Sequence, residues 1–165
     1  MDMQSQDKLE IRKLKLDEIG EALHIIWEVF QEFVAPDYTQ EGIDTFYIEY
    51  IQGEWFREKF KEGKEVMYGA FVDNILVGVL SISEKSTVSC VFVKGNYHGM
   101  GIGKKLFNKV LHQLRNRGVE RIKLNASPYA VPFYHHIGFK DTNMQSSYKG
   151  IVYTPMELVI GEQSL

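Results

Sequence analysis

Four glycines separate a strand-like segment from a helix-like segment, at positions 95, 99, 101 and 103. Before them, Thr87–Val93 is a β-branched run in which apolar residues alternate, as in a strand. After them, apolar residues recur at helical spacing from Ile102 to Leu114. Glycine lets the backbone turn sharply and approach a ligand, and the N–H groups at a helix start point outward. This segment therefore predicts a binding site for an anion.

Positive charge surrounds these glycines. From Lys85 to Val119 there are seven Lys and Arg residues and no Asp or Glu, although the whole chain, with 19 basic and 22 acidic residues, has a net charge of −3. Lys104 and Lys105 fall in the first turn of the predicted helix, where the helix dipole disfavours cations. An anion bound at that turn would remove this penalty. A solvated basic helix face is the alternative, but the strand–glycine–helix context favours phosphate binding.

Two common nucleotide-binding motifs do not fit this loop. A P-loop needs glycine where His98 stands and Ser or Thr where Lys105 stands, and a dinucleotide-binding loop needs glycine in place of Lys104. The Q/R-x-x-G-x-G/A loop of the GNAT superfamily of acyl-CoA-dependent N-acetyltransferases resembles His98-Gly99-Met100-Gly101-Ile102-Gly103. The resemblance implies that the amides of this loop hold the pyrophosphate of CoA. The chain departs from the family at His98, where Gln or Arg is usual.

A second segment, residues 125–139, resembles the same superfamily. Its spacing matches the family's A-x-x-F-Y-x-x-x-G-F motif through Ala130, Phe133, Tyr134, Gly138 and Phe139. The resemblance implies that Tyr134 is the general acid beside the CoA sulfur. A phenol suits this role because its pKa of about 10 keeps it protonated at neutral pH, ready to donate to the departing thiolate. The alternative, a packed aromatic core position, is what we expect of Phe133 and Phe139.

The resemblance also implies which groups hold the cofactor arm. Backbone groups of Phe92 and Val93 would pair with pantetheine as if it were an extra strand, so the strands at Val93 and Asn125 would have to separate. Asn125 would contact the arm or, alternatively, cap the turn before Ser127. Acetyl-CoA is thus the implied co-substrate, with no metal. The implied cofactor-binding residues are Phe92, Val93, His98, Gly99, Met100, Gly101, Ile102, Gly103, Lys104 and Asn125.

A general base is not visible in the sequence. Thr87–Val93 contains no carboxylate. Glu28, Glu32 or Glu84 could act through water, although surface solvation is the more ordinary role for each of them. Cys90, the single cysteine, could take an acyl group, but a cysteine flanked by apolar strand residues is more often packed than reactive. We therefore expect direct acetyl transfer in a ternary complex.

These residues predict one leading function and leave two alternatives. The leading one is transfer of acetyl from acetyl-CoA to a primary amine of a small molecule or a peptide. The alternatives are a non-catalytic acyl-CoA-binding sensor or regulatory module, and nucleotide binding without CoA, which the two failed motifs disfavour. Mild acidity gives no reason to expect nucleic acid as a partner, and no apolar run approaches the ~20 residues that span a membrane. The single cysteine suits a reducing cytoplasm, and a homodimer is left open.

The elements that position these residues fit one domain over residues 1–165, with a polar tail at 1–8. The predicted order is β-α-α-β-β-β-α-β-α-β-β. The strand–helix–strand unit around the glycine loop implies a right-handed crossover and a parallel strand pair. The predicted fold is α+β, a mixed sheet of six to seven strands with helices on both faces. Its last helix starts at Ser127-Pro128 or nearer Ala130, and the closing strands cover Phe139–Met144 and Gly150–Ile160.

Overall fold

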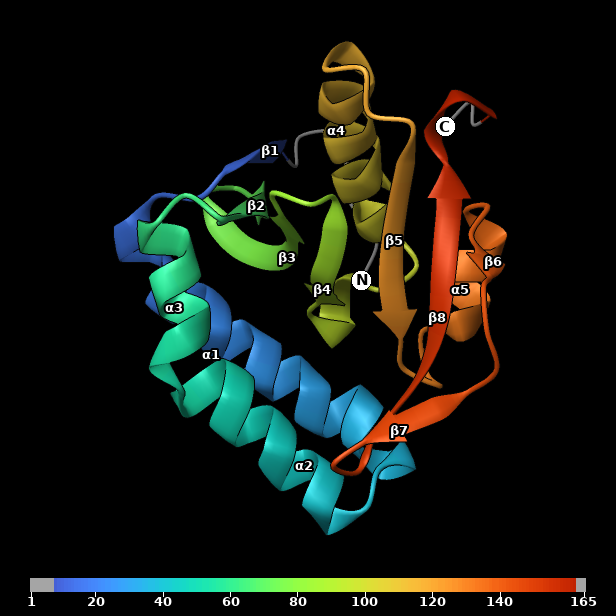
Figure 1. Ribbon diagram of the computed structural model, residues 1–165. Coiled ribbons are helices and arrows are strands. Elements are labelled where there is room, and N and C mark those ends of the chain that lie inside the picture. Colours follow the sequence, from blue (N-terminus) through green and yellow to red (C-terminus); the bar gives the residue numbers. More distant parts are fainter. Residues whose placement is uncertain (1–7, 163–165) are drawn as a thin grey trace.

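One mixed β-sheet runs through the computed structural model, which describes residues 8–162 (Figure 1). The sheet order is β1-β2-β3-β4-β5-β8-β6, and β7 pairs with β8 off this path. The predicted tail at 1–8 lies outside the described residues, apart from Lys8. The strands are β1 (Leu9–Lys13), β2 (Glu65–Val72), β3 (Ile75–Ser83), β4 (Thr87–Val93), β5 (Arg121–Ala126), β6 (Lys140–Asp141), β7 (Ser146–Tyr148) and β8 (Ile151–Val159). The helices are α1 (Ile19–Val29), α2 (Gln40–Phe46), α3 (Glu54–Lys61), α4 (Ile102–Asn116) and α5 (Val131–His136).

Helices cover both faces of this sheet, as predicted. On one face, α4 and α5 pack around a core that includes Phe107 and Ile137. On the other, α1 and α3 pack around residues such as Leu23 and Phe56. Two π-helical segments extend α1 to Val34 and α2 to Gln52. Because both faces are covered, β2 and β3 are buried along almost their whole length and read as continuous apolar runs.

The parallel strands β4 and β5 separate soon after they meet. Their register contains two residue pairs, Thr87↔Lys123 and Val88↔Leu124. Pairing with β5 ends at Ser89. Ser89 is an extra residue in β4, since Val88 and Cys90 on either side of it oppose consecutive residues of β3. A β-bulge of this kind bends its strand. From Ser89 to Val93, β4 therefore follows β3 and leaves β5, which confirms the predicted separation.

Within residues 8–162 the sheet has eight strands, where the sequence predicted six to seven. The predicted strand Phe139–Met144 is wrong in extent, because within it only Lys140–Asp141 pair with β8. Residues 146–148 then form β7, which pairs with β8 as a hairpin. Its turn, Lys149-Gly150, has φ values of 48° and 84°, typical of a tight two-residue hairpin turn. The Ser-Ser-Tyr sequence of β7 lacks hydrophobic alternation, so the pattern gave no sign of this strand.

Of the two predicted starts for the last helix, the later one is correct. Helix α5 begins at Val131 with Ala130 as its N-cap, and not at Ser127-Pro128. The carbonyl of Ser127 accepts hydrogen bonds from the N–H groups of Ala130 and Val131, at 3.0 and 3.1 Å. Residues 127–130 therefore form a turn, which carries the chain from β5 to α5. Pro132 is accommodated in the first turn of the helix, where its missing N–H costs nothing.

The β7 hairpin (residues 146–153) is held against α2 by close backbone contact. Gly42 and Gly150 approach each other so closely that a Cβ on Gly42 would collide with the carbonyl of Gly150. The hydroxyl of Thr45 lies 2.7 Å from the carbonyl oxygen of Lys149, and the hydroxyl of Tyr38 donates to the carbonyl of Val152 at 3.1 Å. In Figure 1, β7 lies beside α2 and the end of α1. The hairpin thus joins the end of the sheet to the α1–α2 layer.

We expect Gly42→Ala to lower the free energy of unfolding by about 2 kcal/mol or more, because the added methyl group forces this contact apart. Gly20→Ala is the matched control, since a Cβ at Gly20 meets no atom within 4 Å. The control should leave stability unchanged or raise it by up to ~1 kcal/mol. Urea unfolding of both variants measures the difference. Equal stabilities would contradict a tight junction between α2 and the β7 hairpin.

Candidate active site

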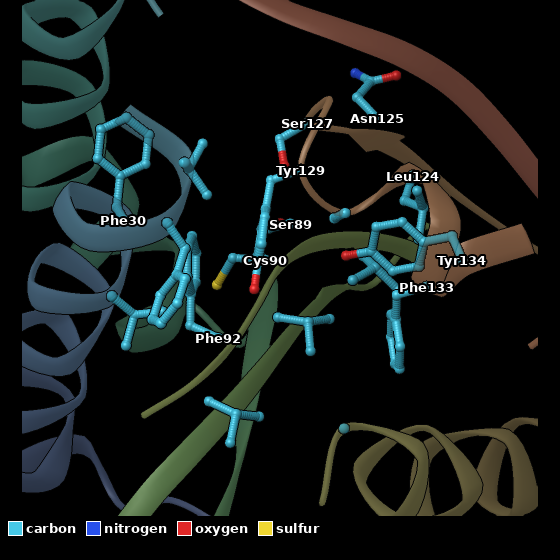
Figure 2. A pocket seen from close by; sticks show the side chains of 18 of the residues that line it. Phe30, Ser89, Cys90, Phe92, Leu124, Asn125, Ser127, Tyr129, Phe133 and Tyr134 are labelled. Carbon is cyan, nitrogen blue, oxygen red and sulfur yellow. The ribbon is translucent and has the colours of Figure 1, made fainter. Parts of the chain in front are cut away.

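A cleft of about 940 Å³ occupies the gap between β4 and β5 (Figure 2). One wall comes from β5, α5 and the glycine loop before α4. The other comes from the end of α1, from α2 with its π-helical continuation, and from the β7 hairpin. Because α4 and α1 cover opposite faces of the sheet, the cleft is lined by residues from both sides of the sheet.

The glycine loop offers backbone donors on the α4 face. Gly99 and Gly101 have φ values of 79° and 76°, which favour glycine, and a Cβ on either would meet no atom within 4 Å. Gly101 is the N-cap of α4, so the N–H groups of the first helical turn lack partners within the helix. The side chain of Lys104 in that turn is exposed. Open space, free donors and positive charge together fit the pyrophosphate of CoA.

Three neighbours of these glycines serve different purposes. Gly103 allows the ring of Phe133 to pack on α4, because a Cβ there would lie 3.1 Å from the ring. Ile102 is buried in the core and Met100 packs partly against it. Of the predicted cofactor-binding residues, these three can therefore reach a phosphate through their backbone and not through their side chains.

The side chain of His98 is engaged within the chain. Its Nε2 lies 2.6 Å from the carbonyl oxygen of Val93, and its ring centroid lies 4.5 Å from that of Phe33. The N–H of His98 donates to the carbonyl of Gly95 at 3.1 Å. His98 thus fixes the end of β4 beside the cleft. Pantetheine pairing with the carbonyl of Val93 would have to share that oxygen with His98, so the prediction of a cofactor contact by His98 stays a prediction.

Tyr134 lies on the α5 wall of the cleft. Its ring makes edge-on contacts with Phe107, Phe133 and Phe139 at centroid distances of 5.4 to 6.0 Å, which fix its orientation. Only 6% of the residue is exposed, but Figure 2 shows its hydroxyl pointing into the cleft toward the side of Cys90. Burial raises the pKa of this phenol further above its ordinary value. Tyr134 therefore holds a proton at neutral pH, at the point where the strands part.

The remaining predicted contacts lie around the same gap. Phe92 and Val93 line the cleft from β4, and Asn125 lines it from the end of β5. Figure 2 shows the amide of Asn125 pointing away from the Tyr134 hydroxyl. The structure therefore brings nine of the ten predicted cofactor residues to one cleft, whereas Met100 is not among its described lining residues.

The predicted carboxylates do not reach this cleft. Glu28, Glu32 and Glu84 are exposed, and none of them belongs to the described lining of the cleft. Glu49, which sequence reasoning missed, is the one acidic side chain among the described lining residues. The phenol of Tyr148 donates a hydrogen bond to its Oε1 at 3.2 Å. The helical spacing of Phe46, Glu49 and Tyr50 was visible in the sequence, but it could not show that this face of the helix meets a cleft.

Cys90 lines the cleft beside Phe92 (Figure 2). Burial is the main cause of a pKa for its thiol well above the ordinary value. The thiolate, and not the thiol, is the nucleophile in acyl transfer to cysteine. The side chain therefore suits a packed wall of the cleft better than a covalent role.

The structure also bears on metals and membranes. Among residues 8–162, no group of three or more His, Cys, Asp and Glu side chains is placed to hold a metal ion. Within the same residues, none of the helices combines the length and the apolar character needed to cross a membrane.

Comparison with known proteins agrees with this geometry. The family model described as an acetyltransferase (GNAT) domain matches residues 34–160. The chain belongs to the GNAT family. A spermidine N(1)-acetyltransferase of Thermoplasma acidophilum is 25% identical to this GNAT chain over 151 residues, covering 80% of this chain and 88% of that protein. An uncharacterized N-acetyltransferase of Gracilaria tenuistipitata var. liui is 29% identical over 99 residues, covering 52% of this chain and 54% of that protein.

Solved structures show the same fold. The PaiA N-acetyltransferase from Thermoplasma acidophilum, in complex with coenzyme A, has a TM-score of 0.74 at 20% identity and covers 92% of this chain and 99% of its own. A GCN5-related N-acetyltransferase from Rhodopseudomonas palustris has a TM-score of 0.81 at 16% identity, with 95% and 99% covered. The predicted family, the α+β fold class and the use of acetyl-CoA are confirmed. This GNAT protein is an acetyl-CoA-dependent N-acetyltransferase.

Gly101→Val should weaken CoA binding at least about tenfold, or ~1.4 kcal/mol, because the side chain enters the space that the pyrophosphate needs. Gly118→Val is the matched control. Gly118 follows the other end of α4, also has a φ of 76°, and also has no atom within 4 Å of an added Cβ. Both variants bear the same backbone strain, so only ligand contact separates them. Titration calorimetry with CoA gives the comparison, and equal affinities would rule out the loop as the pyrophosphate site.

Proposed function

We propose that this GNAT enzyme transfers acetyl from acetyl-CoA to a primary amine of a small molecule or a peptide, by direct attack in a ternary complex. Tyr134 is the general acid in this proposal. The observation that carries it is the placement of the Tyr134 hydroxyl in the cleft where β4 and β5 separate. The cleft at that gap is lined by the glycine loop on one face of the sheet and by aromatic residues on the other.

A cleft lined from both sides of the sheet supports a ternary complex. The glycine loop receives the pyrophosphate on the α4 face, and the unpaired edge of β4 from Ser89 to Val93 is available to the pantetheine arm. The acceptor can then bind on the α1–α2 face, which CoA leaves unoccupied. Because the two substrates approach from opposite faces, both can be present together, and the amine can reach the thioester carbonyl directly.

The Tyr134 phenol supplies the proton that this reaction needs. As the amine nitrogen forms a bond to the carbonyl carbon, the carbon–sulfur bond breaks and the sulfur leaves with its electron pair. Tyr134 gives its proton to that sulfur, the proton lost by the amine passes to water, and the Tyr134 phenolate takes a proton back from water. The raised pKa of Tyr134 keeps its phenol protonated at neutral pH, so that it can act as the acid.

The thiol of Cys90 offers the competing route through an acyl-enzyme. That route requires the thiolate at neutral pH, whereas burial raises the pKa of this thiol. Direct attack needs no such ionisation. Among acceptors, polyamines are reasonable candidates, since a relative at 25% identity is a spermidine N(1)-acetyltransferase.

Tyr134→Phe should lower kcat at least about tenfold and leave CoA affinity nearly intact, because the proton matters only as the thiolate develops. Release of free thiol in the presence of a panel of amines measures the rate. Tyr47→Phe, which removes an exposed phenol outside the cleft, is the control and should keep full activity. Full kcat in Tyr134→Phe would assign this residue to packing. Tight CoA binding without acetylation of any amine would instead favour the sensor alternative.

A further inference from the structure

Glu49 lies on the acceptor side of the cleft. It belongs to the π-helical segment Tyr47–Gln52, which continues α2. Its neighbours Phe46 and Tyr50 pack against the core under α1 and α3, on the sheet face opposite α4. A CoA molecule whose pyrophosphate lies on the glycine loop therefore has its phosphates on one face and Glu49 on the other. Glu49 is placed to meet the acceptor.

Among the residues that the structure describes, the carboxylate of Glu49 has one hydrogen-bond partner. One oxygen, Oε1, accepts the hydrogen bond of the Tyr148 phenol at 3.2 Å. A carboxylate has about four lone-pair sites, so acceptor capacity remains for a ligand. The Tyr148 bond also fixes the carboxylate, because β7 and α2 are held together at Gly42 and Gly150.

Aromatic residues line the cleft together with this carboxylate. Tyr38, Phe46, Tyr50 and Tyr148 line the same side of the cleft. Burial raises the pKa of Tyr38 and of Tyr50 to about 12, so both phenols are neutral, and Glu49 is the one acidic residue among the described lining residues. Aromatic faces attract ammonium groups. The ring of Tyr148 already does so within the chain, since the Nζ of Lys149 lies 5.3 Å from its centroid.

Among the described lining residues, the two ends of the cleft therefore differ in charge, although the ammonium of Lys149, which is not a lining residue, lies over the ring of Tyr148. The glycine-loop end has the exposed ammonium of Lys104 and free backbone N–H groups, whereas the acceptor end has Glu49 together with aromatic residues. The amine that attacks the thioester must be uncharged, because a protonated nitrogen has no free electron pair. An ammonium held by Glu49 is therefore a different nitrogen of the same acceptor. A carboxylate at that place, as in a free amino acid, would be repelled.

We propose that Glu49 binds a second, non-reacting ammonium group of the acceptor, held among the aromatic rings beside Tyr148. The acceptors of this enzyme are then diamines or polyamines. The assignment rests on the proposed amine acetylation and adds to it the residue that selects the substrate.

Binding of spermidine to the CoA complex tests the assignment without requiring turnover. Titration calorimetry should show spermidine binding to the wild-type complex and at least about tenfold weaker binding to Glu49→Gln. The control Glu54→Gln removes the same charge from an exposed position at the start of α3 and should bind like wild type. Absence of spermidine binding to wild type, or equal affinities of wild type and Glu49→Gln, would overturn the proposal.

Two further variants separate ligand binding from a structural role. Tyr148→Phe removes the hydrogen bond to Glu49 and keeps the carboxylate, so it should weaken spermidine binding less than Glu49→Gln does. Equal losses would mean that Glu49 acts as a clamp for the β7 hairpin. Glu49→Asp keeps the charge on a shorter side chain and should restore part of the affinity. Thermal unfolding of each variant identifies any that fails to fold. If Glu49→Gln fails to fold, the spermidine affinity of Glu49→Asp is compared with that of wild type.

Kinetics distinguish the failure of this inference from that of the proposed function. With spermidine as acceptor, Glu49→Gln should raise KM at least about tenfold and leave kcat within a few-fold. With butylamine, which has no second ammonium, kcat/KM should be the same in both enzymes. A fall in kcat for both amines would make Glu49 a proton acceptor and overturn the ammonium site. If spermidine binds in a Glu49-dependent way but is never acetylated, the ammonium site stands and the proposed reaction fails.

Discussion

The bulge at Ser89 is the constraint on which the site depends. It ends the pairing of two parallel strands after two residue pairs, and it leaves the edge of β4 from Ser89 to Val93 without a strand partner. Unpaired backbone groups are costly in a dry interior. Here they face a cleft of about 940 Å³ that solvent or a ligand can fill. The same bend that breaks the ladder therefore creates both the cleft and a backbone edge able to pair with a ligand.

The elements around this gap are held together by close packing. The glycine loop turns the chain from β4 into α4, and Phe133 packs against Gly103 so that α5 lies close to α4. Three aromatic rings around Tyr134 then fix the direction of its hydroxyl. On the other face, the Gly42–Gly150 contact fixes the β7 hairpin on α2. A proton donor and a substrate-binding wall are thus placed by elements far apart in the sequence.

Much of this arrangement could be predicted from local sequence. The glycine loop and Tyr134 lie in short segments that resemble GNAT motifs, and this resemblance implied the family, the cofactor and the separation of the strands. The β7 hairpin was missed because Ser146–Tyr148 is polar, and its Lys149-Gly150 turn is not among the strongest turn pairs. Glu49 was missed because a carboxylate on an amphipathic helix is usually solvated. Only the packing of α2 against β7 turns it toward the cleft.

The central claim is that the thioester of acetyl-CoA lies in the gap that Ser89 opens, beside Tyr134. A crystal structure of the chain with acetyl-CoA tests it most directly. The account predicts pantetheine alongside β4 between Ser89 and Val93, with the sulfur within about 3.5 Å of the Tyr134 hydroxyl oxygen. Acetyl-CoA bound with its thioester outside the gap, or with Tyr134 out of reach of the sulfur, would contradict it.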